Sequence, residues 1–197
     1  MSADDAAADA DLASRAAGGD DHAFTVLMRR HKSPLYRFVW RYVGDRDAAL
    51  EVVQESFVAA WKALQRYDKA RPFPVWLRTI AINKCRDRAR REAVRRAVFR
   101  DCDLNAFEDA WLTDNTPGPE ETLVQREENA RLHAAIARLP AKLKEPLILT
   151  YFEEMSQQAA AEFLGTTVKT IETRLYRARL KLAALLNTAR KSRSLGM

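Results

Sequence analysis

Much of the fold of this chain follows from one stretch near its C-terminus, QQAAAEFLGTTVKTIETRLYRARLK, which spans residues 157–181. An alanine-rich segment leads to a turn centred on Gly165, and a second helical segment follows. Its apolar residues recur at spacings of three and four, which places them on one side of a helix. This predicted buried stripe consists of Val168, Ile171, Leu175, Ala178 and Leu182.

The opposite face of the same predicted helix is basic and hydroxylic. A helix that packs on one side and presents hydrogen-bonding side chains on the other fits the major groove of DNA. The pattern therefore predicts a helix-turn-helix unit that binds DNA. The side chains on this face are Lys169, Thr170, Thr173, Arg174, Arg177 and Lys181.

The composition is that of a folded helical protein. Hydrophobic residues make up 47% of the 197 residues, and there are only six glycines and seven prolines. Helix-period patterns dominate the chain and strand-like alternation is hard to find. We predict an all-α fold.

Charge is distributed in blocks along the chain, whose formal net charge is +6. Residues 71–100 hold ten Arg or Lys against Asp87 and Glu92, and residues 167–193 hold eight against Glu172. Between these blocks, residues 101–128 hold nine acids against Arg126. Two basic blocks separated by an acidic one predict two surfaces that face nucleic acid, although Arg-rich helices can also be plain solvated faces.

Patterns of catalytic or metal-binding residues are missing from the sequence. Cys85 and Cys102 are too far apart for a metal knuckle, and the three histidines are scattered. We find no Gly-rich phosphate loop and no HExxH motif, so we predict no enzyme, no metal and no cofactor. The chain also lacks a signal peptide and a long apolar run, which predicts a cytoplasmic protein without membrane insertion.

The pattern divides the chain into two small helical domains joined by a flexible acidic linker. We expect a flexible acidic leader over residues 1–20, a first domain over 21–96, the linker over 97–120, a second domain over 121–190 and a tail over 191–197. Pro34 and Pro146 fall inside helix-period stretches, where we expect a kink or a new helix start.

The first domain contains a strongly periodic helix near residues 47–65. Its predicted buried stripe consists of Leu50, Val53, Phe57, Trp61 and Leu64, and its other side presents Glu51, Gln54 and Glu55. A proline-containing loop follows over residues 67–74. The next helix packs Trp76, Leu77, Ile80 and Ala81 inward and then becomes almost purely basic.

Three stretches in this order resemble the extracytoplasmic-function (ECF, group IV) class of the sigma-70 family of bacterial sigma factors. DAALEVVQESFVAAWKAL (residues 47–64) is similar to region 2.2, and FPVWLRTIAINKCRDRARR (residues 73–91) to regions 2.3–2.4. The third stretch, residues 139–182, is similar to region 4 and reads LPAKLKEPLILTYFEEMSQQAAAEFLGTTVKTIETRLYRARLKL. The resemblance covers roughly residues 21–186.

The resemblance implies a role for each surface of the first domain. Glu51, Gln54 and Glu55 would bind core RNA polymerase, on the clamp helices of its β′ subunit. The alternative is an ordinary solvated helix face. The loop and the following helix would bind the −10 promoter element through Asp68, Lys69, Arg78, Asn83, Lys84, Arg86, Arg88, Arg90 and Arg91. Pro74 departs from the usual family pattern and could reshape the loop.

In the second domain, the resemblance implies that the recognition helix reads the −35 element. The residues expected to do so are Lys169, Thr170, Thr173, Arg174 and Arg177. Glu172 departs from the family, which often has a basic residue at that position. Its carboxylate could accept a hydrogen bond from a cytosine amino group or pair with a neighbouring arginine, and we favour the pairing.

As a sigma factor, the protein would bind core RNA polymerase, including its β subunit, and direct it to promoter DNA. The family also implies control by an anti-sigma factor and a response to stress. One alternative is a stand-alone helix-turn-helix transcriptional regulator, which would leave residues 47–96 without a role. A helical DNA-processing enzyme is another, and it would require an acidic metal site or a nucleophile that the sequence does not present.

Overall fold

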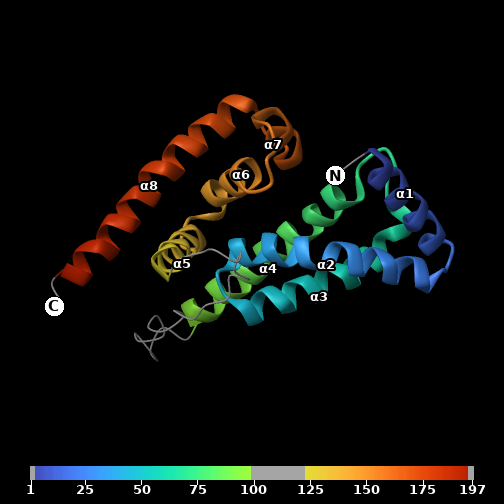
Figure 1. The fold of residues 1–197 in the computed structure, drawn as a ribbon, viewed down its shortest axis with the longest axis horizontal. Helices are drawn as coiled ribbons and strands as arrows, with labels where there is room; N and C mark the ends of the chain where they lie inside the picture. Colours follow the sequence, from blue (N-terminus) through green and yellow to red (C-terminus); the bar gives the residue numbers. More distant parts are fainter. Residues whose placement is uncertain (1–2, 99–122, 195–197) are drawn as a thin grey trace. The chain divides into compact units, whose positions relative to one another are not determined.

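The computed structural model describes residues 3–98 and 123–194, which are helical apart from short connections. The all-α prediction is confirmed for these residues. The chain divides into two compact units, residues 1–98 and 99–197, drawn in Figure 1. The predicted linker over 97–120 lies almost entirely outside the described residues.

The N-terminal unit contains four α-helices and one 3₁₀ turn. They are α1 (Ala3–Ala17), α2 (Asp21–Val43), α3 (Arg46–Ala63), η1 (Leu64–Arg66) and α4 (Phe73–Val98). Helix α2 packs against α1, α3 and α4, and α3 also packs against α4, as Figure 1 shows. Large apolar side chains fill the space between these helices: Leu27, Phe38, Val39, Val52, Phe73 and Leu77.

Carboxylates at the helix starts explain where two of these helices begin. The side chain of Asp20 accepts a hydrogen bond from the amide of Ala23 at 2.9 Å, and that of Asp45 accepts one from Ala48 at 2.7 Å. These bonds satisfy amides that have no partner within the helix. Gly44 ends α2 with φ 80°, a conformation that costs glycine little.

The C-terminal unit contains α5 (Leu123–Ala137), α6 (Ala141–Tyr151), α7 (Gln157–Leu164) and α8 (Val168–Ser194). Helix α8 packs against α5, α6 and α7. Ile136, Ile148 and Leu149 are fully buried beside Ile171 and Ala178 of α8. The stripe predicted for the second helix of the motif is thus confirmed at its centre, while Val168 and Leu182 are half-buried at its ends.

Two prolines lie inside helices instead of interrupting them. Pro34 is within α2 and Pro146 is within α6, which begins at Ala141. Neither proline starts a new helix, which was one of the two outcomes expected at these positions. Pro146 lacks the N–H that would bond to the carbonyl of Lys142, and its burial beside Leu147, Ile148 and Leu149 offsets that loss. Pro34 stands in mid-helix, where the tertiary packing of α2 on three neighbours outweighs the local cost.

No helix in residues 3–98 and 123–194 has both the length and the apolar character needed to cross a bilayer. Within the same described ranges, no group of three or more His, Cys, Asp or Glu side chains is arranged to hold a metal ion.

The N-terminal segment differs from the flexible leader expected over residues 1–20. Residues 3–17 form a helix whose Ala13 and Ala16 are buried, and Asp9 is 0% exposed. Asp9 Oδ1 accepts a hydrogen bond from Arg30 Nη1 at 2.5 Å, and Asp9 Oδ2 lies 2.7 Å from His31 Nε2. A partnered carboxylate and two small residues on one face therefore attach α1 to α2.

Burial lowers the pKa of His31 below its ordinary value, and the attraction of Asp9 opposes this shift without reversing it. The charges of Arg30 and Arg78 lower this pKa further. A neutral imidazole still donates one N–H, so it can bond to the Asp9 carboxylate without carrying a charge. Folding thus disfavours protonation of His31, and the stability of this unit declines as the pH falls below the ordinary imidazole pKa.

We expect Asp9→Ala to lower the free energy of unfolding by about 2 kcal/mol, because it removes the buried acceptor shared by Arg30 and His31. Urea unfolding followed by circular dichroism measures this change. Asp11→Ala is the matched control, since Asp11 is an exposed acid on the same helix. Equal unfolding midpoints for the two variants would contradict a stabilising role for the Asp9 contacts.

Candidate polymerase and nucleic-acid interfaces

The three polar residues of α3 expected to bind polymerase lie within one helical turn and line the same shallow hollow. Gln54 is exposed and lines an apolar groove between α2 and α3. Glu51 and Glu55 instead extend toward α4 and form ion pairs with its cations. Two of the three polar side chains on this face are thus paired within the protein, a contact that spacing along α3 does not indicate.

The groove beside Gln54 contains residues that the sequence assigned to the core. Leu50 is 43% exposed and Trp61 is 39% exposed, whereas Val53 and Phe57 of the same stripe are buried. Met28 of α2 and Val58 of α3 complete the lining of this apolar groove, whose volume is about 570 Å³. Periodicity identified the apolar side of α3, but the contact with α2 covers only half of it.

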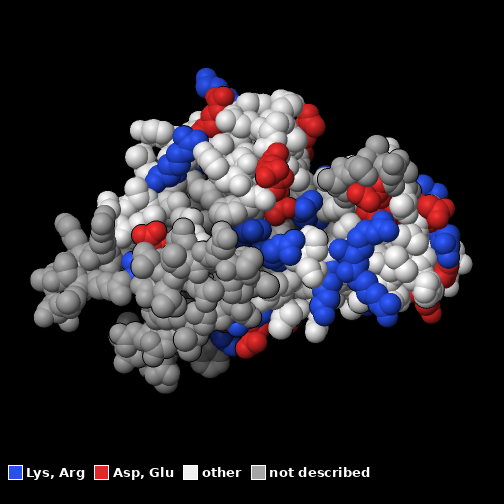
Figure 2. All heavy atoms as spheres, in the orientation of Figure 1, with Lys and Arg blue, Asp and Glu red and all other residues white. Residues whose placement is uncertain are grey.

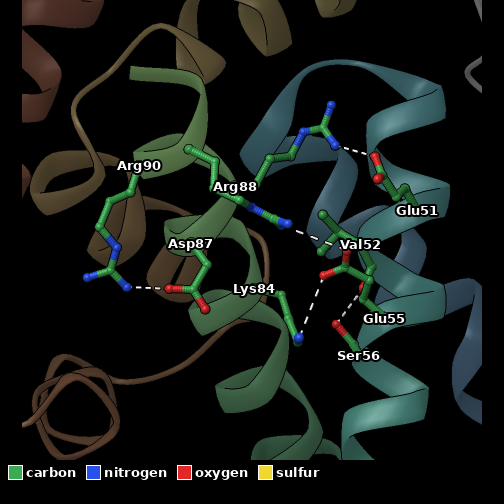
Figure 3. A network of polar contacts seen from close by, with 9 residues as sticks. Glu51, Val52, Glu55, Ser56, Lys84, Asp87, Arg88 and Arg90 are labelled. Atoms are coloured by element: carbon green, nitrogen blue, oxygen red, sulfur yellow. Dashed lines mark hydrogen bonds and ion pairs between the residues drawn. The ribbon is translucent and has the colours of Figure 1, made fainter. Parts of the chain in front are cut away.

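Helix α4 presents cations in two sets. The first set faces α3: Lys84 Nζ lies 3.6 Å from Glu55 Oε2, Arg91 Nη2 lies 3.8 Å from Glu55 Oε1, and Arg88 donates a hydrogen bond to Glu51. Figure 3 shows Lys84 and Arg88 directed at these carboxylates from across the helix interface. Spacings of four and three place these three cations on one side of α4.

The second set lies on the adjacent side of α4, away from these acids. Asn83 is exposed and its Oδ1 is 3.4 Å from Arg86 Nη1, and Arg90 pairs with Asp87 one turn along. Figure 3 shows the pair of Arg90 and Asp87 directed away from α3. An amide beside one guanidinium group, with a second guanidinium one turn further along the helix, suits contact with bases and phosphates.

The inner side of α4 is packed against the rest of the unit. Leu77 and Ala81 are buried there, and Cys85 is 1% exposed. Arg78 is half-buried and its charge lowers the pKa of His31, which places it toward α2. Arg78 therefore lies nearer α2 than the other cations expected to bind the −10 element.

The loop before α4 is held by an aromatic cluster. The rings of Tyr67 and Trp76 lie 4.9 Å apart, and Phe73 contacts both at 5.7 and 5.6 Å. The expectation that Trp76 packs inside the domain agrees with these contacts. Pro74 is buried in the first turn of α4, where its missing N–H has no cost.

Asp68 and Lys69, at the tip of this loop, are both exposed. Asp68 Oδ1 accepts a hydrogen bond from the amide of Ala70 at 2.9 Å, which shapes the turn.

The turn between α7 and α8 is fixed by local hydrogen bonds. Ser156 caps α7 through the amide of Ala159 at 3.1 Å, and Gly165 ends it with φ 62°. The Thr167 hydroxyl then accepts from the amide of Thr170 at 3.2 Å and so caps α8. The turn therefore fixes where α7 ends and α8 begins, the arrangement expected of a helix-turn-helix.

The polar side of α8 is open to solvent. Lys169, Thr173 and Arg177 are exposed, and Thr170 and Arg174 are half-buried. Glu172 is exposed among them and has no ion-pair partner within the described residues. The favoured pairing of Glu172 with a neighbouring arginine is thus not seen in the structure, which leaves its carboxylate available to accept from a base.

Surface charge is mixed rather than purely basic. Figure 2 shows that on the face drawn, Lys and Arg side chains reach the surface in several places beside Asp or Glu. The ion pairs of α4 are one source of this mixture, because they place carboxylates next to the cations of the basic block.

Comparison with known families identifies both units. Sigma-70 region 2 matches residues 27–95 and sigma-70 region 4 matches residues 129–182. The chain belongs to the sigma-70 family, within the extracytoplasmic-function class of RNA polymerase sigma factors. It is thus a transcription initiation factor of bacterial RNA polymerase.

Individual relatives match over nearly the whole chain. The RNA polymerase sigma factor NccH of Alcaligenes xylosoxydans xylosoxydans is 40% identical over 185 residues, covering 94% of this chain and 98% of NccH. CnrH of Cupriavidus metallidurans is 40% identical, covering 91% and 95%. A solved structure of CnrH in complex with the cytosolic domain of CnrY matches with a TM-score of 0.62 and 34% identity, covering 92% of this chain and 98% of that one.

Proposed function

We propose that this sigma factor divides promoter recognition between the outer side of α4 and the polar side of α8. The loop residues Asp68 and Lys69, with Asn83, Arg86 and Arg90, contact the −10 element. A base released from the duplex is bound by polar groups at the loop, and cations hold the flanking phosphates. Lys84, Arg88 and Arg91 join these phosphate contacts once they leave the carboxylates of α3.

The −35 element is assigned to Lys169, Thr170, Thr173, Arg174 and Arg177. The observation that carries this assignment is the exposed polar side of α8 opposite a stripe that is fully buried at Ile171 and Ala178. A helix anchored in this way can enter the major groove without giving up its packing. Hydroxyl and guanidinium groups there bond to base edges and phosphates.

Core polymerase is proposed to bind the surface of α3 that carries Glu51, Gln54 and Glu55. Gln54 beside the apolar groove offers hydrogen bonds at the edge of an apolar contact, a combination typical of protein interfaces. Glu51 and Glu55 attract a basic partner surface. The protein contributes binding and positioning in the cytoplasm and performs no catalysis of its own.

Control by an anti-sigma factor is the regulatory part of the proposal. CnrH, 34% identical in its solved structure, is held in a complex with the cytosolic domain of CnrY. A protein partner of that kind that covers the binding surfaces of this chain would keep it inactive until a stress signal releases it. The alternative of a stand-alone helix-turn-helix regulator leaves the region 2 unit without a role.

In vitro transcription tests the central proposal. Core RNA polymerase supplied with this protein and genomic DNA fragments is expected to start at new sites, upstream of which sequencing reveals a shared −35 and −10 pair. Arg177→Ala and Arg90→Ala should each lower initiation at these sites about tenfold, because each removes one DNA contact of about 1–3 kcal/mol. Full activity of both variants, or no new start sites with the wild type, contradicts the assignment.

Glu172 provides a separate test of base recognition. We expect Glu172→Gln to reduce discrimination for cytosine at one position of the −35 element by about tenfold, since a carboxylate accepts from the cytosine amino group. Binding of the holoenzyme to a set of single-base promoter variants measures this. Glu162→Gln is the control, because Glu162 is an exposed acid on α7 outside the polar side of α8. An unchanged base preference would show that Glu172 only faces solvent.

A further inference from the structure

Two acids of α3 and three cations of α4 form a charge ladder between the helices, which we define as Glu51, Glu55, Lys84, Arg88 and Arg91. The acids are one helical turn apart, and the cations follow at spacings of four and three. Each carboxylate therefore meets a cation directly across the interface (Figure 3). The ladder joins residues at least 29 positions apart in the sequence, so it depends on the tertiary fold.

The strongest contact of the ladder is at Arg88. Its guanidinium bonds to Glu51, and its Nε lies 2.8 Å from Glu92 Oε1 on its own helix. Burial disfavours the charge of Arg88, but the hydrogen bonds and attraction of Glu51 and Glu92 outweigh burial, so the pKa of Arg88 lies above its ordinary value. This cation is shared between two carboxylates in the free protein.

The ladder has a consequence for DNA binding. A cation that binds a phosphate contributes to affinity by releasing a counterion from DNA. A cation already paired with a carboxylate must first leave that partner, which offsets part of the gain. The three cations of the ladder belong to the set assigned to DNA, and the two acids belong to the set assigned to polymerase.

We propose that Glu51 and Glu55 mask Lys84, Arg88 and Arg91 in the free sigma factor and release them when core polymerase binds the two carboxylates. The acids are positioning residues that act on DNA through the cations of α4. Binding of polymerase and binding of the −10 element are then coupled, and the coupling is reciprocal. The inference rests on the proposed assignment of α3 to polymerase and of α4 to the −10 element.

The test measures DNA affinity of the full chain with and without core polymerase. The probe is a fluorescein-labelled fork duplex carrying the −10 sequence, titrated at several salt concentrations. We expect the double variant Glu51→Gln, Glu55→Gln to bind the probe about tenfold more tightly than wild type when free, a typical size for coupling between sites. The slope of log affinity against log salt should steepen by about 0.7–0.9 for each released cation.

Saturating core polymerase should remove this difference in DNA affinity. In the wild type, polymerase then holds the two carboxylates, and in the double variant they are absent, so the cations of α4 are unmasked in both. Asp47→Asn is the matched control: Asp47 is an exposed acid of α3 outside the ladder, so its removal changes the net charge by the same amount per substitution. The single variant Glu51→Gln, which removes the α3 partner of Arg88 and leaves only Glu92, gives a second measurement if the double variant folds poorly. A purely structural role of the acids would not steepen the salt slope.

Two results would overturn the inference. One is that the free double variant has the affinity and salt slope of the wild type. The other is that its gain persists unchanged in the holoenzyme or is reproduced by Asp47→Asn, which would show a general effect of net charge. Arg90→Ala separates these failures from a failure of the proposed function: if that variant leaves probe binding unchanged, α4 does not bind the −10 element at all.

Discussion

The burial of one side of α4 is the constraint on which the rest of the N-terminal unit depends. Phe73, Leu77, Ala81 and Cys85 lie against α2 and α3, and this packing sets the rotation of the helix about its axis. Once the rotation is set, Lys84 and Arg88 must face the acids of α3, and Asn83 and Arg90 must face away. A run of similar basic residues thereby acquires two different environments from apolar contacts alone.

Residue spacing predicted the buried side of a helix well wherever neighbouring helices pack over the whole apolar stripe. The buried positions of α8 and the turn at Gly165 follow from the sequence because both depend on residues a few positions apart. The stripe of α3 was only partly right, since Leu50 and Trp61 stay partly exposed even though Trp61 contacts Phe24 of α2. How much of a stripe is covered depends on the neighbouring helix, which periodicity does not report.

The contacts of charged side chains were the least predictable part of the candidate site. Glu51 and Arg88 are 37 residues apart, and no local pattern indicates that they meet. The same holds for Asp9, whose partners Arg30 and His31 lie on the next helix. From sequence alone, a segment rich in Ala and Asp resembles a solvated leader. The hydrogen bonds of one of its carboxylates to buried donors exist only in the assembled fold, so the sequence pattern does not indicate them.

The place of Cys85 limits how the protein could sense oxidants. Its thiol lies on the packed side of α4, opposite the surface proposed for DNA. Peroxide or a thiol reagent has little access to this thiol while α4 stays packed on its neighbours. Cys85 is therefore a component of the core, and its burial restricts direct access of oxidants to this thiol.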